Sequence, residues 1–124
     1  MSVPILKQGD VLIASIQSAL SDQDLIDLRD GFAERIGHLR IKGVLIDVTA
    51  LDVLDSFATR TLRAIAYVAK LRGAATVVVG IQPDVAFAMV QLGLSLDGVI
   101  TALDLEEGLA HLGGQAREGR RHDG

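Results

Sequence analysis

The chain has 124 residues and a formal net charge of −4, and 49% of its residues are hydrophobic while only 3% are aromatic. This length suits one domain with an aliphatic core. The acidic balance argues against a nucleic-acid partner, which would need Lys and Arg contacts to phosphates. The chain contains no cysteine, which excludes a disulfide framework, a thiolate metal site and a cysteine nucleophile.

The first residues, Met1 to Pro4, lack the basic and apolar regions of a signal peptide. The longest apolar run, about Ala74 to Val79, is far shorter than the roughly 18 residues that a membrane span needs. We therefore expect a cytoplasmic protein with no membrane partner.

The chain begins with a predicted hairpin followed by a helix. Pro4–Lys7 and Val11–Ile16 have the pattern of two short strands around a turn at 8–10. Ser21 and Asp24 have the spacing of a capping box, with serine at the N-cap and a carboxylate at N3. Spacings of three and four then predict one apolar helix face, formed by Leu25, Leu28, Phe32, Ile36 and Leu39.

A buried strand and a second helix are predicted in the middle of the chain. Gly43–Val48 is apolar enough for burial on both faces. The helix is predicted from about Ser56 to Leu71, with Gly73 suited to end it. Its two faces differ in chemistry. The inward face is formed by Ala58, Leu62, Ile65 and Ala69, and the opposite stripe by Arg60, Arg63, Tyr67 and Lys70.

The last third continues the alternation. Ala75–Val79 is predicted as a buried strand, and Pro83 suits the first position of a short helix that Gly93 ends. Val99–Ile100 is a short strand, and Asp104–Glu107 has the pattern of a second capping box. Two sets of apolar residues are expected to pack: Val85, Phe87, Met89, Val90 and Leu92 in the short helix, and Leu105, Leu109 and Leu112 in the last one.

Strands that alternate with helices imply βαβ crossovers. The predicted fold is therefore α/β, with a mixed, mostly parallel sheet of about five strands and about four helices. We expect one domain over residues 1–113. Residues 114–124 are charged and glycine-rich, and we expect them to form a disordered tail.

Ser56 stands where the acidic loop after a buried strand meets a helix. Its hydroxyl could cap that helix or accept a phosphate, because a helix N-terminus offers free N–H groups to an anion. Asp52 and Asp55 would form an acidic rim that repels added phosphate. Thr59 is either a second acceptor or simply a residue that the first turn tolerates.

Two further sets of residues have alternative interpretations. Arg60 and Arg63, with the rest of their stripe, could form a solvated face or bind acidic groups of a partner. Asp47, with the acidic loop, could hold magnesium or act in acid–base chemistry, but no lysine, second acidic motif or glycine-rich phosphate loop accompanies it. The alternative for Asp47 is a local cap of the loop. His38, His111 and His122 share no metal-ligand spacing, so we expect no metal or cofactor.

The order of these elements, with Asp-Ser before the second helix, resembles the STAS domain of anti-sigma-factor antagonists. Several segments are similar to the stressosome branch and its small single-domain subunit, over about Pro4 to Leu112. Phe57 and Ala58 follow the serine, where members that bind an anti-sigma kinase directly typically have Ser-Gly or Ala-Gly. The similar segments are Pro4–Leu6, Ile46–Thr49, Leu54–Phe57, Gly80–Ala86 and Thr101–Leu109.

The resemblance implies a non-enzymatic signalling scaffold in which Ser56 is the phosphorylated residue. The unphosphorylated protein would hold a serine protein kinase of the histidine-kinase-like ATPase fold within a large hetero-oligomer. Longer STAS paralogues with sensor domains would complete that assembly. Phosphorylation would release the kinase and regulate a stress response, and a metal-dependent phosphatase would reset the site. The expected partner-binding residues are Asp52, Asp55, Ser56, Phe57, Thr59, Arg60 and Arg63.

Two other functions remain open at this stage. The first is a direct antagonist that frees a sigma factor by binding an anti-sigma kinase. The second is a small nucleotide-binding or hydrolytic enzyme that uses the loop from Asp47 to Ser56.

Overall fold

The computed structural model describes residues 3–122, and the side chains of residues 3–113. The strands form one sheet in the order β1-β2-β3-β4-β5, in which β1 and β2 are antiparallel and the other neighbours are parallel. The predicted mixed, mostly parallel sheet is confirmed. In chain order the elements are β1 (Ile5–Gln8), β2 (Val11–Ser15), α1 (Asp22–His38), β3 (Gly43–Asp47), α2 (Ser56–Leu71), β4 (Ala75–Val79), α3 (Pro83–Gln91), β5 (Ile100–Ala102) and α4 (Leu105–His122).

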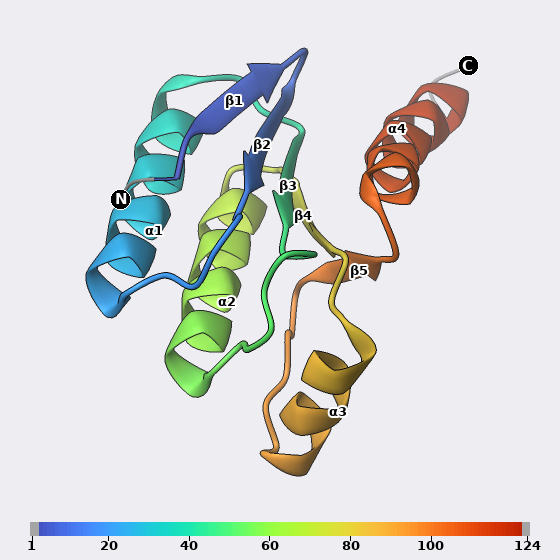
Figure 1. The fold of residues 1–124 in the computed structure, drawn as a ribbon. Coiled ribbons are helices and arrows are strands. Elements are labelled where there is room, and N and C mark those ends of the chain that lie inside the picture. The colour runs from blue at the N-terminus through green and yellow to red at the C-terminus, as the bar shows by residue number, and fades with distance from the viewer. Residues whose placement is uncertain (1–2, 123–124) are drawn as a thin grey trace.

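Helices cover both faces of this sheet (Figure 1). The helices α1 and α2 pack side by side on one face, and α4 lies against β3, β4 and β5 on the other. The short helix α3 lies beyond these layers, near the edge strand β5. The loops that lead into α2 and α3 both leave the carboxyl ends of parallel strands, so they meet at one end of the sheet.

The core has two apolar layers because successive strand residues face opposite sides of the sheet. Val44 and Ile46 of β3 face the layer under α1 and α2, and Leu45 faces the smaller layer under α4. All three side chains are fully buried. The prediction of a strand buried on both faces is therefore confirmed.

The predicted capping box opens α1. The Asp24 backbone N–H donates to Ser21 Oγ at 3.1 Å, and the Ser21 N–H donates to the Asp24 carboxylate at 3.2 Å. The expected apolar face is buried from Leu25 to Ile36. Leu39 does not belong to it, because α1 ends at His38 and the backbone of Leu39 is extended.

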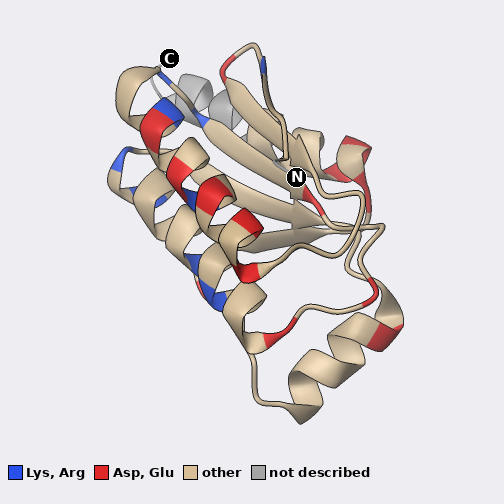
Figure 2. Ribbon diagram, turned by 60° about the vertical axis from the view of Figure 1, so that its left-hand side comes forward, with Lys and Arg blue, Asp and Glu red and all other residues tan. Residues whose placement is uncertain are grey.

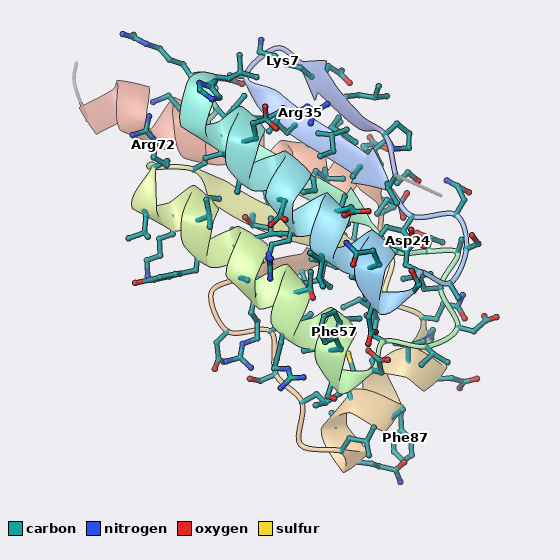
Figure 3. All side chains as sticks on the ribbon, turned by 90° about the vertical axis from the view of Figure 1, so that its left-hand side faces the viewer. Lys7, Asp24, Arg35, Phe57, Arg72 and Phe87 are labelled. Carbon is teal, nitrogen blue, oxygen red and sulfur yellow. The ribbon has the colours of Figure 1, made fainter. Side chains whose placement is uncertain are left out.

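The expected packing of α3 is largely wrong. Val85 and Met89 are buried, but Phe87, Val90 and Leu92 are 65%, 77% and 69% exposed. This nine-residue helix contacts the rest of the domain along one side only, and Figure 3 shows Phe87 on its outer side. No second layer covers that side in the described part of the chain.

The C-terminal elements differ from prediction in three details. The last strand is β5 at Ile100–Ala102, not Val99–Ile100. At the start of α4 the Glu107 N–H donates to Asp104 Oδ1 at 2.9 Å, but the Glu107 carboxylate accepts from Leu103 N–H at 3.2 Å. The second capping box is thus only half formed. Leu112 is buried and Leu109 half-buried, but Leu105 is 43% exposed.

The backbone of α4 is helical to His122, where a disordered tail over 114–124 was expected. Ala, Gln, Glu and Arg in this segment favour a helix, and they continue one that has already begun at Leu105. Residues 123–124 lie outside the described part of the chain. The domain boundary after residue 113 stays a prediction.

Candidate functional site

The loop between β3 and α2 is anchored in the core just before Ser56. Leu51 and Leu54 are 7% and 5% exposed, although Asp52 and Val53 between them point to solvent. The two leucines line an apolar hollow of about 110 Å³ together with side chains from the segment before α1, from the start of α1 and from α2. The position of Ser56 is therefore set by Leu54, two residues earlier.

Asp55, not Ser56, is the N-cap of α2. The Asp55 backbone is extended and its Oδ1 accepts from the Ala58 N–H at 2.8 Å. Ser56 is the first residue inside the helix. Of the two roles left open for the Ser56 hydroxyl, the role as a helix cap is wrong. Both residue types are good caps, and the carboxylate of Asp55 already occupies the N–H that a cap would bind.

The Ser56 hydroxyl is consequently uncommitted. Ser56 is exposed, and no hydrogen bond to its Oγ is found among the described residues. Thr59 contrasts with it: the side chain is 1% exposed, and its Oγ1 donates to the Asp55 carbonyl at 2.8 Å. In the first turn of α2 the hydroxyl that faces solvent is that of Ser56. The structure places Thr59 inside, away from the expected partner-binding surface.

Asp47 caps the loop after β3. Its Oδ1 accepts from the Thr49 backbone N–H at 2.9 Å and from Thr49 Oγ1 at 2.6 Å. This is the local role left open as the alternative to a magnesium site. Within the described residues, no group of three or more His, Asp or Glu side chains is placed to hold a metal ion.

The loop after the neighbouring strand β4 braces the loop after β3. The Gln82 side-chain amide donates to the Thr49 carbonyl at 2.8 Å. Gly80, at φ 81°, packs directly on Thr49, where a Cβ would lie 3.1 Å from the Thr49 Cα. Sequence reasoning missed this contact because it joins residues far apart in the chain. The local signal for this contact in the sequence is the glycine at position 80, which suits a positive φ.

Basic side chains extend from Ser56 along α2. Arg60, Arg63 and Lys70 are exposed on the same stripe as Ser56. In Figure 2 basic positions of one helix lie beside a row of acidic positions on the neighbouring helix. The Arg60 guanidinium carbon lies 5.9 Å from the centroid of the Phe57 ring. Phe57 is half-buried and packs on the core at the start of α2 (Figure 3). Phe57 can therefore present only part of its ring to a partner.

The capping role of Asp55 gives a testable expectation. Asp55→Ala should lower the free energy of unfolding by about 1 kcal/mol, the usual cost of losing an N-cap side chain. Asp52→Ala removes the neighbouring exposed carboxylate, which has no capping role, and should change stability by less than about 0.5 kcal/mol. Urea unfolding followed by circular dichroism measures both. Equal losses in the two variants would contradict the assignment of the cap.

The fold and this site define the class of protein. A family model described as STAS domain matches residues 2–107, and the chain belongs to the STAS family. The α/β fold expected from the order of elements is thereby confirmed.

Within this family the chain is similar to stressosome proteins. A solved serine-to-glutamate variant of RsbS from Moorella thermoacetica is 40% identical, with a TM-score of 0.81 over 93% of this chain and 97% of that chain. A chain in a structure of the stressosome, described as a signal integration and transduction hub, is 41% identical, with a TM-score of 0.77 over 92% and 99%. The predicted resemblance to the stressosome branch is confirmed.

A longer relative also matches. The RsbT co-antagonist protein RsbRA of Bacillus subtilis (strain 168) is 29% identical over 109 residues. The match covers 86% of this chain but only 38% of the length of that relative. Among the described helices, none is both long enough and apolar enough to cross a lipid bilayer.

Proposed function

We propose that this protein is a non-enzymatic signalling scaffold of a stressosome. It binds a serine protein kinase while Ser56 is unmodified and releases the kinase when Ser56 is phosphorylated. The observation that carries the proposal is the exposed Ser56 hydroxyl at the first position of α2, beside a cap that another residue already supplies. An enzyme that uses the loop from Asp47 to Ser56 finds no such support, because Asp47 is committed to Thr49.

The chemistry requires only a substrate hydroxyl from this chain. The Ser56 Oγ attacks the γ-phosphorus of ATP held by the kinase, and the bond from that phosphorus to the bridging oxygen breaks. ADP leaves, and the hydroxyl proton passes to a base that the kinase supplies. The product carries up to two additional negative charges next to Asp52 and Asp55. A surface that was complementary to the kinase then differs in charge at its centre.

The proposed partners follow from the same reading. Longer STAS paralogues with sensor domains would build a large hetero-oligomer around this chain, in line with its similarity to a stressosome chain and to a longer RsbR-type relative. A metal-dependent phosphatase would remove the phosphate. The kinase-binding surface would comprise the exposed residues around the start of α2, namely Asp52, Asp55, Ser56, Arg60 and Arg63, with part of Phe57.

Kinase capture tests the proposal. We expect the protein, assembled with its longer paralogues, to elute as a megadalton particle that retains the kinase without ATP and releases it after ATP is added. A non-hydrolysable ATP analogue serves as the control and should leave the kinase bound. Release by the analogue, or retention after complete phosphorylation, would contradict the proposal. A small complex with an anti-sigma kinase alone would instead support a direct antagonist.

A further inference from the structure

The proposed phosphorylation would place an anion at the head of the basic stripe on α2. Residues four apart on a helix are neighbours, with Cβ atoms about 6 Å apart. Arg60 is the residue four positions after Ser56, and both side chains are exposed. An arginine side chain on the next turn can therefore reach a phosphate carried on Ser56 Oγ.

Arg60 is free to change partner. Its recorded contact is with the Phe57 ring, and no ion pair to it is found among the described side chains. Asp97 lines the same shallow hollow as Arg60 without pairing to it. A dianionic phosphate offers a planar guanidinium a stronger, bidentate partner than a ring face does.

The rest of the first turn favours the same arrangement. The Ser56 and Phe57 backbone N–H groups have no partner within the helix, and the N-terminal end of the helix dipole attracts negative charge. Asp52 and Asp55 oppose it, but the Asp55 Oδ1 already accepts a hydrogen bond from the Ala58 N–H. The cationic side chain and the free N–H groups lie on the helix itself, whereas Asp52 belongs to the preceding loop.

We propose that Arg60 is the intramolecular counter-ion of phosphorylated Ser56. This inference rests on the proposed function and adds how the modification acts. The phosphate withdraws Arg60 from the exposed basic stripe, so that Ser56 and Arg60 together no longer present a cation. A partner whose acidic group binds Arg60 in the unmodified form then loses this contact, because the phosphate pairs with Arg60 instead. Repulsion from the acidic rim would add to this loss.

The pairing is tested on full-length protein with phosphoserine installed at position 56 during translation. A phosphorus NMR titration measures the second pKa of the phosphate. In Arg60→Gln we expect this pKa to be higher than in the wild type by about 0.2 to 0.4 unit, because a nearby cation stabilises the dianion. In Arg60→Lys the increase should be smaller.

Lys70→Gln is the matched control. It removes one positive charge from the same stripe at a distance of about 21 Å from Ser56 along the helix axis, and should leave the phosphate pKa unchanged. Asp52 and Asp55 are present in every variant, so their influence cancels. Equal phosphate pKa values in the wild type and Arg60→Gln would overturn the pairing. Since no kinase is used, this result is independent of whether Ser56 is a kinase substrate.

Discussion

Ser56→Ala is expected to keep the kinase bound in the presence of ATP, whereas Ser56→Asp should bind it more weakly even without ATP. Alanine removes the Oγ atom that would accept the phosphate in this proposal. Aspartate places a negative charge at the first position of α2, next to Arg60, and so imitates part of the modified state. A pulldown of the kinase by each variant, with and without ATP, measures the effect.

The same variants separate a switch from a structural defect. Because Asp55 caps α2, Ser56→Ala should change the free energy of unfolding by less than about 0.5 kcal/mol. A serine that capped the helix would instead cost about 1 kcal/mol on removal. Wild-type behaviour of both variants in the pulldown would contradict the switch. A loss of stability in Ser56→Ala similar to that in Asp55→Ala would contradict the geometry.

Gly80→Ala should be the most destabilising single-methyl change near the site. The backbone at Gly80 has φ 81°, which costs a non-glycine residue about 1 to 2 kcal/mol. The new Cβ would also lie 3.1 Å from the Thr49 Cα, and backbone atoms cannot move aside cheaply. We expect a loss of about 2 to 4 kcal/mol in the free energy of unfolding.

Gly73→Ala provides a closely matched control. Gly73 has φ 82° after the end of α2, but nothing lies within 4 Å of the position of its Cβ. Its substitution should therefore cost only the backbone contribution of about 1 to 2 kcal/mol. Urea unfolding of the two variants isolates the contact between Gly80 and Thr49. Equal losses would show that this contact does not hold the loop before Ser56.

The elements that the sequence predicted well are those whose pattern is local. The spacing of Leu25, Leu28, Phe32 and Ile36 defines one side of α1, and the Ser21–Asp24 pair marks its start. In α2 the small apolar residues and the basic stripe lie on opposite faces, as their spacing requires. Such patterns depend on neighbours three or four residues away, so the sequence alone contains them.

The errors arise where tertiary packing, or competition between neighbouring residues for one role, determines the structure. The helix α3 carries apolar residues on all of its sides, so their spacing could not show that Phe87 and Val90 would remain exposed. Asp55 and Ser56 are both good caps, and only the backbone geometry shows which of them binds Ala58. The bond between Gln82 and Thr49 depends on the sheet that brings two distant loops together.

Part of the candidate site could be predicted because its residues are neighbours in the sequence. Asp55 and Ser56 are adjacent in sequence and necessarily meet at the start of α2, and Arg60 follows on the next turn. Thr59 shares this turn but points inward, because the helix buries the side that also carries Ala58 and Leu62. Ser56 and Thr59 are three residues apart, so their side chains differ in direction by about 60° around the helix axis. This difference separates an exposed hydroxyl from a buried one.

Mapping of phosphate by mass spectrometry, after incubation with the cognate kinase and ATP, tests the central claim most directly. We expect the intact protein to gain about 80 Da, located on the peptide that contains Ser56, and no gain in Ser56→Ala. An unmodified protein under conditions in which the kinase is active, or a phosphate on another residue with Ser56 untouched, would contradict it.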